Sequence, residues 1–110
     1  MNLDDLDLFK KIDPQNLLAD IDGLPDQLQT AWDLGQTQLL PDFKDIQAIV
    51  ITGMGDSAIA AELVTASVFS SIRLPVTLHR GYGLPAFANS KATLVVCVSH
   101  SGNTEEVLDV

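Results

Sequence analysis

Two apolar runs in this chain are each followed by a glycine-containing loop and then by a helical pattern. Residues 46–52 lead into Gly53-Met54-Gly55-Asp56-Ser57, and residues 93–98 lead into Ser99-His100-Ser101-Gly102-Asn103-Thr104. A continuous apolar run of this length is typical of a strand buried on both faces, as in a parallel sheet. Two such strand–loop–helix units therefore predict an α/β fold with both loops at one edge of the sheet.

The rest of the chain completes this prediction. A further strand is expected over residues 75–80, joined to the first by a helix over 57–71 in a right-handed crossover. The fold class we predict is α/β, with a doubly wound parallel sheet in flavodoxin-like order that is incomplete and preceded by N-terminal helices. Residues 1–40 form the helical lead-in and residues 41–110 the sheet domain.

The lead-in has apolar residues at helical spacing, namely Leu17, Ile21, Leu24, Leu28 and Trp32. Gly23 and Pro25 interrupt the pattern, so two helices are expected, with Pro25 in the first turn of the second, where its missing N–H costs little.

Charge and cysteine content exclude several classes of partner. Acidic residues outnumber basic ones by 15 to 6, for a net charge of −9, which repels nucleic acid and anionic membranes. Residues 1–7 are acidic and do not have the basic and apolar stretches typical of a secretory signal, and no apolar run is long enough to span a membrane. The single cysteine, Cys97, lies in a predicted strand and is expected to be a small core residue. We expect a cytoplasmic protein with no metal and no cofactor.

The two loops predict a shared anion site. Helix N-termini present unpaired backbone N–H groups, and hydroxyls add donors without adding charge. The expected phosphate ligands are Gly55, Ser57, Ser99, Ser101 and Thr104. Three further residues are expected close to the substrate, namely Gly53, Arg80 and His100.

Each of these residues also has a structural alternative. The hydroxyls serve equally well as helix caps, with Asn103 as an N-cap and Glu106 closing a capping box. In the same way, Arg80 suits an ion pair with nearby acids, and His100 suits sideways packing in its loop.

Three segments together resemble bifunctional phosphoglucose/phosphomannose isomerases of the sugar isomerase (SIS) superfamily, whose domains bind phosphosugars. They are residues 53–61, Pro75-Val76 with Arg80-Gly81-Tyr82-Gly83-Leu84-Pro85, and residues 99–106, in family order. The resemblance implies the phosphosugar-binding part of an aldose–ketose isomerase that interconverts glucose 6-phosphate or mannose 6-phosphate with fructose 6-phosphate. It also implies a place in glycolysis and gluconeogenesis and a homodimer in the full-length protein.

The same resemblance places the catalytic residues elsewhere. In the resembled isomerases the glutamate base, a histidine and a lysine come from later in the chain, so the catalytic residues remain unknown and residues 1–110 alone are expected to be inactive. We expect the chain to be an N-terminal fragment, because the helix that begins near Thr104 has barely started by Val110.

Asp56 departs from the family, which usually has glycine at this position. We expect it either to cap the helix that begins at Ser57 or to face the phosphate. If the Asp56 carboxylate lay about 6 Å from a phosphate charge, at an effective dielectric near 20, the two would repel each other by on the order of 2–3 kcal/mol per charge pair.

Two rival functions remain open. Residues 53–58 also satisfy the G-x-G-x-x-A pattern of a dinucleotide site, and Arg80 suits a phosphorylated cofactor, so a fragment of an NADP-binding oxidoreductase is one alternative. The other is a non-catalytic SIS module that senses sugar phosphates or dimerises.

Overall fold

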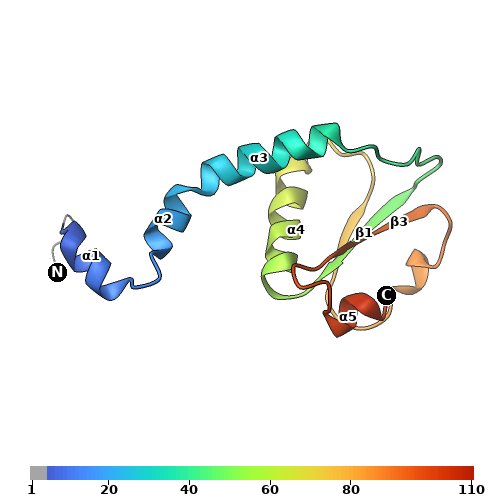
Figure 1. Cartoon of the computed structure of the whole chain (residues 1–110). Helices are drawn as coiled ribbons and strands as arrows, with labels where there is room; N and C mark the ends of the chain where they lie inside the picture. The colour runs from blue at the N-terminus through green and yellow to red at the C-terminus, as the bar shows by residue number, and fades with distance from the viewer. Residues whose placement is uncertain (1–4) are drawn as a thin grey trace. The chain divides into compact units, whose positions relative to one another are not determined.

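The protein is described by a computed structural model that covers residues 5–110. The chain divides into two compact units, one ending at Pro41 and the other running from Asp42 to Val110. The first unit is helical, and the second contains the sheet (Figure 1).

Three helices make up the first unit: α1 (Leu6–Ile12), α2 (Leu17–Asp22) and α3 (Leu24–Thr37). Gly23 ends α2 and precedes α3, and Pro25 lies in the first turn of α3, so the predicted division of the lead-in is confirmed. Asp13 joins α1 to α2, because its carboxylate accepts the backbone N–H of Leu18 at 2.9 Å. This bond is the main reason that the pKa of Asp13 lies below its usual value.

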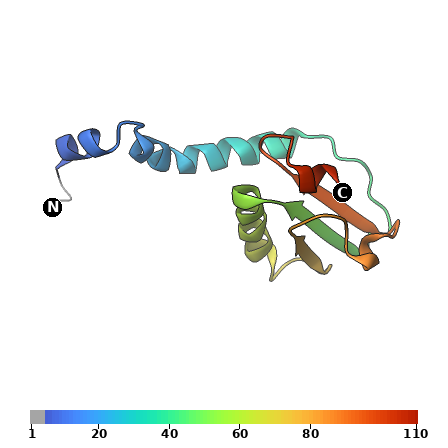
Figure 2. The same ribbon diagram turned by 90° about the horizontal axis from the view of Figure 1, so that it is seen from below.

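The second unit is built on three parallel strands, β1 (Ala48–Gly53), β2 (Val76–His79) and β3 (Thr93–Val98). Their order is β2-β1-β3, so the first strand in sequence lies in the middle (Figure 2). This arrangement confirms the predicted α/β class and the parallel sheet. β1 extends one residue further than expected, because Gly53 still pairs with Val98.

The connection from β1 to β2 is the helix α4 (Gly55–Val68), which lies against all three strands. Two alanines, Ala58 and Ala61, are buried, and their small side chains let α4 approach the sheet closely. The helix begins two residues before the predicted start at Ser57. It ends at Val68 rather than at residue 71. After this end the chain turns, and the backbone N–H groups of Ser71 and Ile72 both donate to the carbonyl of Val68.

The sheet is covered unevenly. Ile51, Val96 and Val98 line a groove together with residues of α4, so strand alternation places Val50 and Thr52 on the opposite face. Val50 and Thr52 are the largest fully buried side chains, with 0% and 1% of their surface exposed. Two short elements belong to the part of the unit after β2: η1 (Ala86–Ala88) lies against β3, and α5 (Glu105–Leu108) lies against β1.

One prediction about the core is wrong. Cys97 was expected to be buried, but the structure exposes it. It pairs with Thr52 in the sheet register, yet β3 is an edge strand, and α5 lies against the central strand instead. Thr52 is therefore buried from solvent, whereas Cys97 stays exposed.

Within residues 5–110, no helix combines the length and apolar character that crossing a membrane requires.

Candidate functional site

The loop after β1 depends on two glycines. A Cβ on Gly53 would lie 3.0 Å from the carbonyl oxygen of Val98 and 3.4 Å from the backbone nitrogen of Ala58, so a side chain would push apart the ends of β1 and β3. Gly55 has a φ of +52°, in the left-handed region that favours glycine. The two glycines thus allow an abrupt turn from the strand into α4.

The N-terminus of α4 carries no side-chain cap. Met54 is the N-cap residue, and no side chain bonds to the first turn of the helix. The expectation that Asp56 caps a helix beginning at Ser57 is therefore wrong, because Asp56 is already the second residue of α4. An uncapped 14-residue helix that opens toward a loop is a favourable place for an anion.

The loop after β3 holds its hydroxyls together. The Ser99 hydroxyl lies 2.9 Å from the Thr104 hydroxyl and 3.4 Å from that of Ser101. Two backbone N–H groups complete the cluster: that of Gly102 donates to the Ser99 hydroxyl at 3.1 Å, and that of Asn103 donates to the Ser101 hydroxyl at 3.2 Å. We call Ser99, Ser101 and Thr104 the hydroxyl cluster.

The capping box considered as an alternative for this loop is absent. Thr104, not Asn103, is the N-cap residue of α5, and no side chain makes a cap hydrogen bond there. The hydroxyls bond to one another and to the loop backbone instead, with Gly102 at a φ of +66°. Helix capping therefore does not explain why three hydroxyls occur in this loop.

The two loops meet at a cavity of about 600 Å³, lined by Asp56, Ser57, Ala60, Val98, Ser99 and His100. The location follows from the topology. The chain leaves β1 toward β2 on one side and returns to β3 on the other, so the strand order reverses between β1 and β3. Ligands of open α/β sheets bind at such a reversal, beyond the carboxyl ends of the strands.

The structure brings together most of the residues predicted for the site. Ser57, Ser99 and His100 line the cavity, and hydrogen bonds tie Ser101 and Thr104 to Ser99. Gly55 is the first residue of α4, and Gly53 lies beneath it at the contact between the strands.

Arg80 is engaged elsewhere. Its guanidinium forms an ion pair with the carboxylate of Glu62 on α4, which is the structural alternative considered for this residue. The side chains that line the cavity include no lysine or arginine and one carboxylate, Asp56. An anion bound here would be held by neutral hydroxyls and backbone N–H groups.

Sequence reasoning missed a link between the segment after β2 and α5. The Tyr82 hydroxyl donates to Glu105 at 3.1 Å, and the Gly83 N–H donates to Asp109 at 2.7 Å. The hydrogen bond to Glu105, with the nearby charges of Glu106 and Asp109, raises the pKa of Tyr82 above its usual value. The Gly-Tyr-Gly sequence signals a turn, but it gives no indication of the distant carboxylates.

His79 alternates along a predicted strand, and the sequence gives it less functional weight than His100. Its Nε2 is buried and has no hydrogen-bond partner within the part of the chain that the structure describes. His79 pairs with Thr52 in the sheet register, at the end of β2. Its ring does not line the cavity between the two loops.

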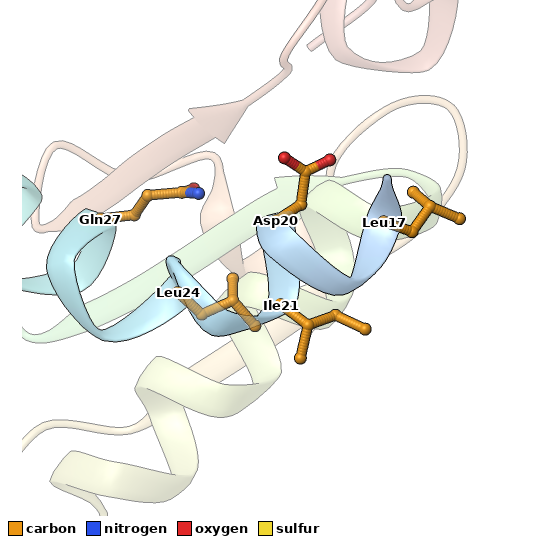
Figure 3. Close-up of a pocket in the computed structure, with 5 residues that line it drawn as sticks. All are labelled: Leu17, Asp20, Ile21, Leu24 and Gln27. Atoms are coloured by element: carbon orange, nitrogen blue, oxygen red, sulfur yellow. The ribbon is translucent and has the colours of Figure 1, made fainter. Parts of the chain in front are cut away.

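Another hollow, of about 510 Å³, lies in the helical unit between α2 and α3 and is lined by Leu17, Asp20, Ile21, Leu24 and Gln27. Figure 3 shows the Asp20 carboxylate pointing away from the Ile21 side chain. This lining has no hydroxyl and no cation, so it does not suit a phosphate. Across residues 5–110, no cluster of histidine, cysteine and carboxylate side chains is arranged to hold a metal ion.

Comparison with curated proteins shows two related sequences. A bifunctional phosphoglucose/phosphomannose isomerase of Caldicellulosiruptor bescii is 44% identical over 87 residues, which are 78% of this chain and 25% of that protein. A protein of the same name from Thermoplasma volcanium is 44% identical over 62 residues, or 54% of this chain and 18% of that protein. The chain thus spans at most about a quarter of the length of these relatives. No protein-family model matches it, and no solved structure matches it significantly.

Proposed function

We propose that this chain, a relative of the bifunctional phosphoglucose/phosphomannose isomerases, forms the phosphate-binding part of an aldose–ketose isomerase. The reaction would interconvert glucose 6-phosphate or mannose 6-phosphate with fructose 6-phosphate. The observation that carries the proposal is the cavity where the uncapped N-terminus of α4 meets the hydroxyl cluster.

In this proposal the phosphate is bound without a cationic side chain. Ser57 offers a hydroxyl at the start of α4, and Ser99, Ser101 and Thr104 offer three more from the facing loop. Each hydrogen bond from a neutral donor to a charged group contributes about 1.5–3 kcal/mol. Several convergent donors are thus sufficient to hold a dianion in a chain whose net charge is −9.

The chemistry of isomerisation requires more than this anchor. A base must move a proton between adjacent carbons, an acid must open the sugar ring, and developing oxyanion charge needs stabilisation. The cavity lining supplies one carboxylate, Asp56, and one imidazole, His100. We place the base and the acid in the part of the isomerase that this chain does not span. Residues 1–110 would bind the phosphate, and the energy of this binding would position the sugar for the reaction.

The proposal extends to domain organisation and setting. Residues 1–40 would be a helical lead-in, and residues 41–110 would be part of a SIS phosphosugar-binding domain. The full-length protein would be a cytoplasmic homodimer acting in glycolysis and gluconeogenesis, and it would use neither a metal nor a cofactor.

Binding of glucose 6-phosphate to the intact protein, measured by calorimetry, tests the proposal. The combined variant S99A/S101A/T104V should lose most of the affinity, because it removes all three loop hydroxyls. The control is Ser67→Ala, since the Ser67 hydroxyl bonds to the carbonyl of Val64 on the same helix as Ser57, remote from the cavity lining. Equal affinities of the combined variant and the wild type would contradict the proposal. Tight NADP binding without any response to sugar phosphates would favour the oxidoreductase instead, and sugar phosphate binding without turnover would favour a non-catalytic SIS module.

A further inference from the structure

Two hydrogen bonds tie the segment after β2 to the helix that follows the hydroxyl cluster. The Tyr82 hydroxyl donates to Glu105 in the first turn of α5, and the Gly83 N–H donates to Asp109 just past the end of that helix. Gly81 and Gly83 have φ values of +126° and +65°, which allow the chain to turn on both sides of Tyr82. Neither bond contributes to the sheet or to the cavity lining.

Glu105 is the neighbour in sequence of a proposed phosphate ligand. Glu105 directly follows Thr104, whose hydroxyl bonds to Ser99 at the edge of the cavity. Without the hydrogen bond from Tyr82, the carboxylate would be free to turn toward the hydroxyl cluster, where its charge would repel a bound dianion. The hydrogen bond from Tyr82 restricts this movement.

We propose that Tyr82 is a positioning residue for the phosphate site: its hydroxyl holds the Glu105 carboxylate to one side of the hydroxyl cluster and so reduces repulsion of the bound anion. This inference rests on the proposed function, since it concerns the same site. Tyr82 is not among the residues that line the cavity, and it acts through Glu105.

The surroundings of Tyr82 support a charge-based role. The acidic groups that act on its hydroxyl are Glu105, Glu106 and Asp109, all on or next to α5. The hydroxyl is therefore an uncharged donor that faces several negative charges on the helix that follows the hydroxyl cluster. Because the Tyr82 side chain is 61% exposed, solvent screens this contact, and the expected effect on affinity is correspondingly small.

A double-mutant cycle on the intact protein tests the proposal, with affinities for glucose 6-phosphate and for inorganic phosphate measured by calorimetry. Tyr82→Phe keeps the ring and removes the hydroxyl, and it should weaken binding of both probes by about two- to fivefold. Glu105→Gln removes the charge and should tighten binding. In the Glu105→Gln background, Tyr82→Phe should have no further effect. Glu106→Gln is the matched control, since the Tyr82→Phe effect should persist beside it.

Salt and stability separate this role from a purely structural one. Added salt should shrink the Tyr82→Phe effect, while the melting temperatures of Tyr82→Phe and the wild type should be close. Equal affinity of Tyr82→Phe and the wild type, or an effect that survives in the Glu105→Gln background, would overturn the inference while the proposed function stands. A third outcome would keep the inference and contradict the proposed function. In that case Tyr82→Phe and Glu105→Gln would have coupled effects on the binding of inorganic phosphate, but the protein would show no preference for glucose 6-phosphate and no isomerase activity.

Discussion

The carbonyl oxygen of Val98 lies 3.0 Å from the point where a side chain on Gly53 would begin. This short distance shows that the carboxyl ends of the central strand and one edge strand lie close together, next to the cavity that Val98 lines. The oxygen belongs to the backbone, so it cannot turn aside as the end of a flexible side chain would. The site therefore depends on Gly53, although this residue is not part of the cavity lining.

We expect Gly53→Ala to lower the free energy of unfolding by about 1–3 kcal/mol, because the added methyl group overpacks the contact between β1 and β3. It should also weaken sugar phosphate binding by moving the two loops apart. Gly35→Ala is the control, since a Cβ at this position within α3 meets nothing within 4 Å and should stabilise the protein by about 0.5–1 kcal/mol. Denaturant unfolding and calorimetry measure both effects. Equal stability of Gly53→Ala and the wild type would show that the strands can separate without cost.

Asp56 should oppose phosphate binding. It lines the cavity from the first turn of α4, so its negative charge would lie near a bound anion. Asp56→Asn should tighten glucose 6-phosphate binding several-fold and should cost a few tenths to about 1 kcal/mol of stability, because it removes a negative charge from a helix N-terminus.

Asp26→Asn is the matched control for Asp56→Asn. Asp26 lies in the first turn of α3, and its removal changes the net charge and the helix end in the same way, without a change at the cavity. Calorimetry should show unchanged affinity for this variant. Unchanged or weaker binding by Asp56→Asn would mean that the carboxylate does not act on the ligand.

The ionisation of Tyr82 should report its contact with Glu105. Its pKa is raised in the folded state, so folding favours the protonated phenol. The resulting stabilisation is present below pH 10, the ordinary value, and is lost as the pH rises through the higher folded value. The chain has a single tyrosine, so phenolate absorbance follows this one group.

In such a titration Glu105→Gln should shift the Tyr82 midpoint downward toward its ordinary value, because the charged acceptor is gone. Asp7→Asn, at a carboxylate on α1 that pairs with Lys10, should leave the midpoint in place. An identical midpoint in the wild type and Glu105→Gln would show that the hydroxyl and the carboxylate are not paired in solution.

Cys97 should react with a thiol reagent in the folded 110-residue chain, since its side chain is exposed on the edge strand. The reaction should proceed at a rate close to that in denaturant and should leave the circular dichroism spectrum unchanged. Protection of the thiol until the chain unfolds would mean that another surface covers the outer side of β3.

The sequence predicts β1 and β3 well because each follows a largely apolar run that ends at a glycine or a hydroxyl. The division of the lead-in at Gly23 and Pro25 is also predictable, since both residues have strong backbone preferences. Exposure is harder to predict: Cys97 lies in an apolar run, but its burial depends on where α5 lies.

The candidate site also has parts that the sequence predicts and parts that it does not. Ser57 and Ser99 could be predicted as cavity residues because hydroxyl side chains in a glycine-containing loop after a strand indicate an anion site. The alternative of a capping box failed because the hydroxyls bond to one another. The link from Tyr82 to Glu105 joins residues 23 positions apart, and neither local periodicity nor composition contains such a pairing.

The reversal of strand order at β1 has a consequence for how this pocket tolerates change. The helix α4 leaves the carboxyl end of β1 toward β2, away from β3, and β3 continues into α5, so neither connection joins the carboxyl ends of β1 and β3 directly. The hollow is thus a product of how the chain is routed, and the side chains around it decide only what it accepts. Substitutions along the lining should exchange one ligand for another while the space itself persists, which makes this position of the fold a durable site for acquiring new specificities.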